Sequence, residues 1–277
     1  MQTWLALAAG WTMALAAHAG APERVVTLGG SVTEIVYGLG QEGRLVGDDL
    51  SSLYPEAATR LPHVGYYRAV PVEGVLALEP DLVLASEQAG PPEALRRLAE
   101  VGVRVVTVPD RPSVDSLQAR IRDVAAALDA APQGERMVER VARELERAEA
   151  VPASRARAIL LFKLGGVLRG AGNGTAANKV MTMAGLVNVL HDQQGYKPIS
   201  AEAVSALAPD VIVVTKSSLA ASGGKAGLLA TPGIASTPAA ARQRLIVMDD
   251  PLLLGMGPRL PQALTELKRE VAGAMAR

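Results

Sequence analysis

The segment LPHVGYYRAV at residues 61–70 brings together side chains that could bind a metal. It places two of only five tyrosines, Tyr66 and Tyr67, directly beside Arg68. A phenolate is a hard anionic oxygen donor that suits ferric iron, and tyrosine is one of the axial ligands of haem iron. A free tyrosine has a pKa of about 10, so such a ligand needs a neighbouring cation that favours its anion. Arg68 can supply that charge, although the residue types alone fit a simple turn with one packed ring equally well.

The rest of the chain lacks the residue patterns of common enzymes. Cysteine is absent, and the three histidines, His18, His63 and His191, are scattered without the spacing of a zinc site. The sequence contains neither a G-x-S-x-G nor a G-x-x-x-x-G-K-[ST] motif. We therefore expect a binding protein rather than an enzyme, and a secreted hydrolase is the least favoured alternative.

A glycine-rich stretch, GGVLRGAGNG at residues 165–174, follows a predicted strand and precedes a predicted helix. Backbone N–H groups in such a position can hold an anion. The compact fingerprint of a nucleotide-binding loop is missing. The stretch is therefore predicted to be a loop that lines a ligand cleft.

The elements that must position these residues follow an α/β pattern. Short β-branched runs alternate with helical stretches on both sides of a strand-free, Ala-, Glu- and Arg-rich segment. We expect two similar α/β lobes, each with a central, mostly parallel sheet, joined by a long helix and enclosing a ligand cleft. The predicted boundaries are an N-terminal lobe at 20–130, a linking helix at 131–152 and a C-terminal lobe at 153–277.

An internal repeat supports two lobes of like fold. VEGVLALEPDLVLAS at 72–86 matches AEAVSALAPDVIVVT at 201–215, and Glu73 aligns with Glu202. Each copy predicts a short helix with a glutamate in its first turn, a Pro-Asp stop and a buried strand. A chance recurrence of this common unit is the alternative.

The N-terminal residues 1–19 are predicted to be a signal peptide, because an apolar run ends in a small-x-small cleavage pattern. An N-terminal anchor or buried helix is the alternative. Secretion predicts a periplasmic protein. With 28 basic and 28 acidic residues the chain has no net charge, which argues against nucleic acid as a partner.

Five segments together resemble the periplasmic haem-binding proteins of bacterial haem ABC importers, which share the larger fold of the cobalamin- and siderophore-binding proteins. They are RVVTLGGSVTEIVYGLG, VGYYR, EGVLALEPDLVLAS, GYKPISAEAV and LLLGMGPRLPQAL, and the resemblance covers nearly the whole chain after the signal peptide. It implies that Tyr66 is the axial ligand of haem iron and that Arg68 hydrogen-bonds its phenolate. Family members usually carry another residue at the position of Tyr67, which makes Tyr67 a second candidate ligand.

The same resemblance implies partners. Glu73 and Glu202 would dock into the inner-membrane ABC permease, while an outer-membrane haem uptake system would supply haem indirectly to a monomeric receptor. Haem propionates need cations, and Lys225 and Arg259 are favoured over Arg169 and Lys179 because they lie in Gly- or Pro-marked loops. A cobalamin or ferric-siderophore receptor is the alternative, which would keep the fold and the two glutamates without needing an anionic tyrosine.

Overall fold

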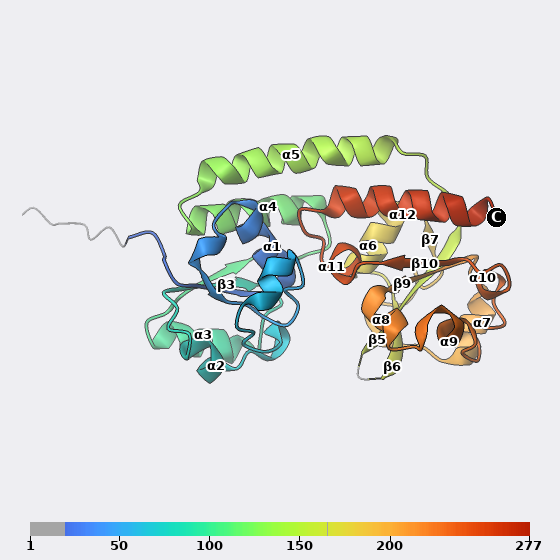
Figure 1. Ribbon diagram of the computed structural model, residues 1–277, viewed down its shortest axis with the longest axis horizontal. Helices are drawn as coiled ribbons and strands as arrows, with labels where there is room; N and C mark the ends of the chain where they lie inside the picture. Colours follow the sequence, from blue (N-terminus) through green and yellow to red (C-terminus); the bar gives the residue numbers. More distant parts are fainter. Residues whose placement is uncertain (1–19, 165) are drawn as a thin grey trace, which may run out of the picture.

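The computed structural model describes residues 20–277 except Gly165, so the predicted signal peptide lies outside the described residues. Figure 1 shows two α/β lobes side by side, with helix α5 (Ala131–Ala150) running along both of them. We call the part from β1 to α4 the N-terminal lobe and the part from β5 to α12 the C-terminal lobe. The predicted two-lobed α/β fold with a long joining helix is confirmed.

The N-terminal lobe is built on a four-stranded sheet in the order β2-β1-β3-β4, in which every neighbouring pair is parallel. Its central strands β1 and β3 are buried along their whole length, as expected for apolar runs covered by helices on both faces. The bounds of its elements are β1 (Val25–Leu28), α1 (Gly30–Gly38), β2 (Leu45–Gly47), α2 (Val72–Leu76), β3 (Leu82–Ser86), α3 (Pro92–Glu100), β4 (Arg104–Val108) and α4 (Val114–Ala127), with 3₁₀ turns at Glu42–Arg44, Glu56–Arg60 and Tyr67–Ala69.

The C-terminal sheet has the order β10-β9-β5-β6-β8 and is mixed. Strands β10, β9 and β5 pair in parallel, whereas β6 pairs antiparallel with both β5 and β8. The bounds are β5 (Arg157–Leu164), β6 (Val167–Ala171), α6 (Ala176–Met183), β7 (Val187–Asn188), β8 (Tyr196–Pro198), α7 (Ala201–Leu207), β9 (Val211–Thr215), α8 (Lys216–Ala220), α9 (Gly224–Leu229), α10 (Pro238–Ala241), β10 (Leu245–Met248), α11 (Asp250–Leu254) and α12 (Leu260–Met275).

The predicted glycine-rich loop is corrected by this sheet. Residues 167–171 form strand β6, which returns along β5 immediately after the turn at Gly166. Gly166 has φ 79°, a left-handed conformation that glycine adopts without steric cost. The small residues that suggested a loop are tolerated in the strand because Gly170 faces Leu190, where a Cβ would lie only 2.3 Å from that side chain.

Helix α5 is held to both lobes through one apolar face. Met137, Val141 and Leu145 recur at helical spacing and are buried, while the opposite face is charged and exposed. The core cluster that contains them continues into strands and helices of both lobes. The α5 carboxyl end is capped by Lys268 of α12, whose ammonium donates hydrogen bonds to three main-chain carbonyls, including that of Ala148 at 2.8 Å.

The internal repeat corresponds to the same unit in both lobes. Residues 72–86 form α2 and β3, and residues 201–215 form α7 and β9. An arginine at the start of the first strand of each lobe completes the unit. Arg24 reaches the carbonyl of Leu78 at 2.7 Å, and Arg157 reaches the carbonyl of Leu207 at 2.9 Å. Among the described residues, none of the helices is long and apolar enough to cross a membrane.

Candidate functional site

The loop between β2 and α2 carries the tyrosine pair and presents Tyr66 to the outside. Tyr66 stands just before the 3₁₀ turn Tyr67–Ala69 in extended backbone, and 43% of it is exposed. Tyr67 is half-buried against it, with the two ring centroids 5.0 Å apart and the rings nearly perpendicular. Tyr66 is therefore the accessible phenol of the pair.

Arg68 pairs with Tyr67 rather than with Tyr66. Its Nε donates a hydrogen bond to the Tyr67 hydroxyl at 3.0 Å, and its Nη2 lies against the side-chain oxygen of Gln88. Burial nevertheless raises the pKa of Tyr67 to about 12, with Arg68 opposing that rise. The predicted Arg68–Tyr66 hydrogen bond is thus absent from the described structure, because the 3₁₀ turn places the guanidinium over the neighbouring ring.

The segment next to the tyrosine pair exposes apolar side chains, which we call the apolar patch: Leu50 and Leu53 are 55% and 50% exposed, and Tyr54 is 41% exposed. The backbone N–H of Leu50 donates to the carbonyl of Gly65 at 2.9 Å, so this patch is tied to the residue that precedes Tyr66. Exposed apolar side chains on the same loop as an accessible phenol suit a large, apolar ligand.

Two buried aspartates hold this loop in place. The Asp49 carboxylate accepts hydrogen bonds from the backbone N–H groups of Gly29 at 2.9 Å and Tyr67 at 3.3 Å. Asp48 accepts from, or donates to, His63 Nδ1 at 2.5 Å. Burial raises the pKa of Asp48 to about 7, and His63 opposes that rise. The loop is therefore pre-organised by side chains that do not themselves reach the surface patch.

A buried ion pair joins the two lobes next to this loop. Arg259, just before α12, donates to Glu34 of α1 from its backbone N–H and from Nη2, both at 3.1 Å. The Arg259 guanidinium carbon also lies 3.3 Å from the centre of the Tyr54 ring. Burial raises the pKa of Glu34, and Arg259 opposes the rise. Arg259 is thus engaged by the glutamate of the other lobe, and its role towards a propionate stays a prediction.

One face of the mixed C-terminal sheet carries an aromatic pair. Phe162 of β5 and Tyr196 of β8 pack edge to face on it, with centroids 5.2 Å apart. Burial raises the pKa of the Tyr196 phenol, and the hydrogen bonds with Ala177 and Thr175 and, to a smaller degree, the Arg68 charge on the other lobe oppose the rise. That influence places Tyr196 within electrostatic reach of the Arg68 guanidinium. Arg169 of β6 lies on the same face.

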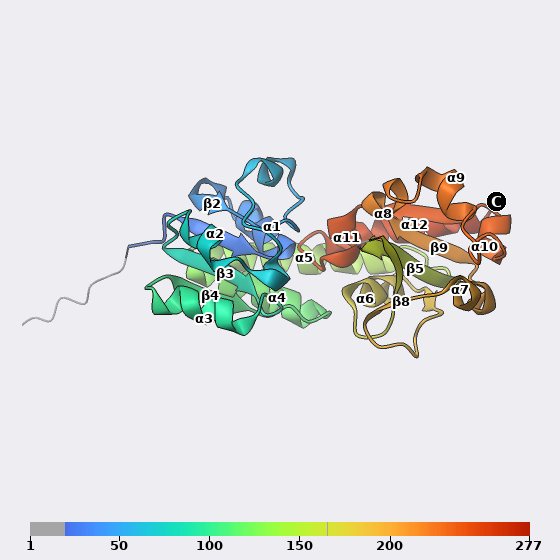
Figure 2. The ribbon, with the colours of Figure 1, turned by 90° about the horizontal axis from the view of Figure 1, so that it is seen from below.

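The other favoured cation, Lys225, lies elsewhere. It belongs to α9, which Figures 1 and 2 both place on the side of α8 away from the N-terminal lobe. Its ammonium reaches the carbonyl of Gln243 at 3.5 Å, and it lines a groove with Leu229 and Gln243. The role of Lys225 towards a propionate stays a prediction.

The repeated glutamates are both exposed on first helical turns. Glu73 begins α2 and Glu202 begins α7, and both helices lie on the half of the molecule away from α5 (Figure 1). Hydrogen bonds from its own backbone N–H and from Ser200 lower the pKa of Glu202. The structure thus presents one accessible carboxylate on each lobe.

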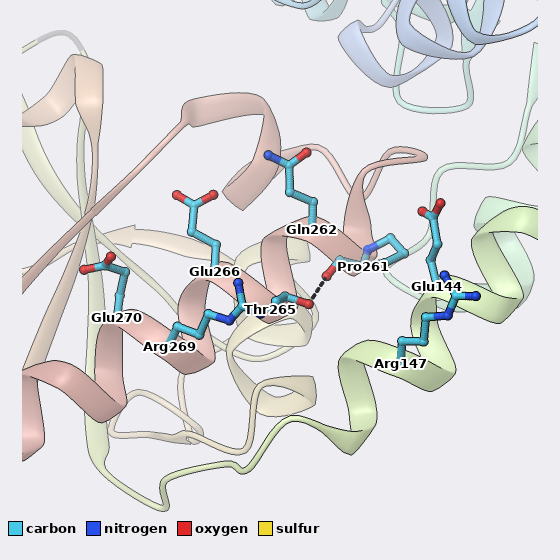
Figure 3. A pocket seen from close by; sticks show the side chains of 8 residues that line it. All are labelled: Glu144, Arg147, Pro261, Gln262, Thr265, Glu266, Arg269 and Glu270. Atoms are coloured by element: carbon cyan, nitrogen blue, oxygen red, sulfur yellow. Dashed lines mark hydrogen bonds between the residues drawn. The ribbon is translucent and has the colours of Figure 1, made fainter.

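A separate groove of about 510 Å³ lies between α5 and α12 (Figure 3). Its lining combines acidic and basic side chains, namely Glu144, Arg147, Glu266, Arg269 and Glu270, with Pro261, Gln262 and Thr265. This mixture gives no single charge that would select an ionic ligand, and the tyrosine pair does not contribute to it. Within residues 20–277 other than Gly165, no group of three or more His, Cys, Asp or Glu side chains forms a metal site.

Sequence reasoning missed the Glu34–Arg259 pair and the isolation of Arg169. The first joins residues 225 positions apart, and no spacing rule connects them. The position of Arg169 depends on how β5 pairs with β6, and the glycine-rich sequence of β6 did not predict that pairing. The sequence contained only one hint of a role for Arg169, which is that it was one of the four candidate cations in the second half of the chain.

Comparisons with known proteins agree with the two-lobed geometry. A sequence profile of the family described as "Periplasmic binding protein" matches residues 25–252. The periplasmic heme-binding protein RhuT from Roseiflexus sp. RS-1, solved in apo form, is 40% identical with a TM-score of 0.87, covering 91% of this chain and 98% of that chain. The periplasmic heme-binding protein BhuT, solved with two hemes, is 42% identical with a TM-score of 0.85 and the same coverage.

A curated relative lies further away. The vitamin B12-binding protein of Yersinia pestis (strain Pestoides F) is 30% identical over 198 residues, which is 70% of this chain and 70% of that protein. Identity to the two heme-binding structures is higher and extends over more of the chain.

Proposed function

The chain belongs to the periplasmic binding protein family, and we propose that it is a haem receptor that delivers ferric haem to an ABC importer. The observation that carries this proposal is the exposed phenol of Tyr66, in a loop that also exposes Leu50, Leu53 and Tyr54. The 40% and 42% identities to heme-binding structures of the same fold support the same ligand. A cobalamin receptor would not need an accessible phenol beside that patch.

Tyr66 is the iron ligand in this proposal. A phenolate bound to ferric iron is an oxygen donor matched to a hard cation, and the charged metal favours the ionised form. Tyr67 and Arg68 act together as its support, since the guanidinium already lies between the pair and Gln88. Leu50 and Leu53 then cover part of the macrocycle and remove apolar surface from water.

The test is a visible titration of purified protein with haemin. We expect a saturable Soret change with ferric tyrosinate features in the wild type, lost in Tyr66→Phe, which removes only the hydroxyl. Tyr67→Phe is the matched control and should keep the tyrosinate features with weaker binding. If Tyr67→Phe loses those features and Tyr66→Phe keeps them, Tyr67 carries the iron. If the wild type binds cyanocobalamin and not haemin, the receptor has the alternative cargo.

Delivery uses the two repeated glutamates. Exposed carboxylates at equivalent positions of two lobes can engage basic pockets on two halves of a permease. Glu73→Gln and Glu202→Gln should each reduce haem transfer to the reconstituted importer while leaving haemin affinity unchanged. Glu93→Gln is the matched control, because Glu93 also stands exposed on a first helical turn but outside the repeat. Equal transfer by all three variants would exclude docking through the repeat.

Location in the periplasm follows from residues 1–19 acting as a signal peptide. Expression of the full chain in a Gram-negative host should release a mature form whose N-terminus follows Ala19. N-terminal sequencing of the periplasmic fraction checks this, and a protein that retains Met1 on the membrane would instead be anchored.

A further inference from the structure

Arg169 is a cation whose side chain has no partner in the described chain. Its Nε is buried and makes no hydrogen bond with the described residues, and the guanidinium takes part in no ion pair there. Leaving a buried donor unpaired is costly, and more so for a charged group. Part of this cost is recovered if an acceptor arrives with the ligand.

The strand register fixes the direction in which Arg169 points. It is the cross-strand partner of Phe162 on β5 and of Pro198 on β8, and partners in an antiparallel pair share a face. Tyr196 shares this face as well, because it pairs with Ala171, two positions along β6 from Arg169. Arg169 therefore stands beside the aromatic pair rather than on the face that carries Lys163.

Arg169 belongs to the part of the C-terminal lobe that lies nearest the N-terminal lobe. It is on the β5–β6 hairpin, which lies at the side of the C-terminal lobe that borders the N-terminal lobe in Figure 1. Tyr196 also lies within electrostatic reach of Arg68 and Asp110 of the N-terminal lobe. A ligand held by Tyr66 and packed against Phe162 and Tyr196 would extend toward Arg169.

The other cations near this region are already engaged. Arg259 is neutralised by Glu34, and Lys163 donates to the carbonyl of Ala221 at 3.3 Å on the opposite face of β5. Arg68 is bound to Tyr67 and Gln88. The buried Nε of Arg259 also lacks a hydrogen-bond partner, but its guanidinium is paired with Glu34. Of these cations, Arg169 is the one that makes neither an ion pair nor a side-chain hydrogen bond with the described residues.

We propose that Arg169 is a carboxylate-binding site that takes a propionate of the haem held by Tyr66. The guanidinium offers two parallel N–H groups to a carboxylate, and the aromatic pair beside it shields that contact from water. This inference rests on the proposed haem function and deepens it. It assigns the anionic edge of the ligand to the C-terminal lobe and its metal to the N-terminal lobe.

The test combines substitutions of Arg169 with two ligands, one that has free propionates and one in which they are esterified. Haemin and haemin dimethyl ester, in the same detergent, are titrated into wild type, Arg169→Leu and Arg169→Lys. We expect Arg169→Leu to bind haemin roughly tenfold to a hundredfold more weakly, as for the loss of a charged hydrogen bond, and to bind the ester about as well as the wild type does. Arg169→Lys should recover part of the loss for haemin only.

Two controls separate this inference from the proposed function and from misfolding. Arg242→Leu removes an exposed C-terminal cation at the end of α10, which is not assigned to the ligand, and should leave both affinities unchanged. The Soret features of the complex should be the same in Arg169→Leu and wild type, because the iron ligand is untouched. A structural defect would weaken both ligands equally, so the ratio of the two affinities within each variant decides the question.

The outcomes are distinct. If Arg169→Leu weakens haemin and ester by the same factor, or neither, the carboxylate site is refuted while haem binding through Tyr66 stands. If the wild type binds neither ligand, the haem function falls, and the inference with it.

Discussion

The two lobes share one unit and differ in what is added to it. In each lobe a short helix, a Pro-Asp turn and a buried strand are fastened by an arginine from the first strand, Arg24 in one and Arg157 in the other. The N-terminal lobe adds the long loop at 48–70, and the C-terminal lobe adds the antiparallel strands β6 and β8. The shared unit carries the two glutamates that we propose for docking, whereas the additions carry Tyr66, Tyr196 and Arg169, which we assign to the ligand.

The additions also differ from each other in how they present their side chains. The N-terminal loop exposes Leu50, Leu53 and Tyr66 above two buried aspartates that fix its backbone. The C-terminal sheet half-buries Phe162 and Tyr196 and leaves Arg169, the cross-strand partner of Phe162, without a hydrogen-bond partner for its Nε. One lobe thus exposes a phenol with apolar side chains, and the other carries an aromatic pair with a cation beside it.

The largest expected effect on stability concerns the ion pair that joins the two lobes. Glu34→Ala leaves the Arg259 guanidinium buried without its carboxylate, and removing one partner of a buried pair typically costs about 3–5 kcal/mol. We expect a loss of this size in the free energy of unfolding, measured by urea denaturation. Glu42→Ala, at an exposed position of the same lobe, should cost little. A loss no larger than that of Glu42→Ala would mean that the pair does not hold the lobes together.

The equivalence of the shared unit can be tested in its core. Val75 and Val204 occupy matching positions in α2 and α7, and both are completely buried. Replacing either with alanine removes two methyl groups and leaves a small cavity, so each change should destabilise the protein by about 1–3 kcal/mol. Chemical denaturation measures both. Costs that differ by more than twofold would show that the two copies are packed unequally.

A smaller effect on stability is expected from Asp48 in the N-terminal loop, and it depends on pH. Burial raises the pKa of Asp48 to about 7, so the folded protein binds this proton more readily than the unfolded chain does. The stability that Asp48 contributes is full below its ordinary pKa of about 4 and is lost as pH rises through about 7. The free energy of unfolding of wild type relative to Asp48→Asn should therefore fall between pH 4 and pH 8. A difference that is constant over this range would contradict the shift.

The smallest expected effect on folding lies at the docking positions. Glu73 and Glu202 are exposed, and Glu73→Gln or Glu202→Gln should leave the thermal unfolding midpoint unchanged within error. Differential scanning calorimetry checks this. A clear loss of stability in only one variant would mean that this glutamate has a structural role that its counterpart lacks.

The sequence predicted those features that depend on local pattern. The repeat at 72–86 and 201–215, the amphipathic helix near 131–152 and the exposed tyrosine loop are all visible in composition and periodicity, and the two-lobed fold is confirmed. Features that depend on three-dimensional register were out of reach. The hydrogen bond from Arg68 to Tyr67 rather than to Tyr66 depends on a single 3₁₀ turn. The Glu34–Arg259 contact depends on how α1 packs against the segment before α12.

The two joins between the lobes restrict their relative motion in a particular way. One join is α5 with its capping lysine, and the other is the Glu34–Arg259 pair beside the tyrosine loop. A body fixed to another at two separated points retains one easy rotation, about the line through those points. The lobes should therefore twist against each other more readily than they separate. A permease that grips both lobes would then empty the receptor by torsion, which changes the angle between the tyrosine and the aromatic pair while the chain connections stay intact.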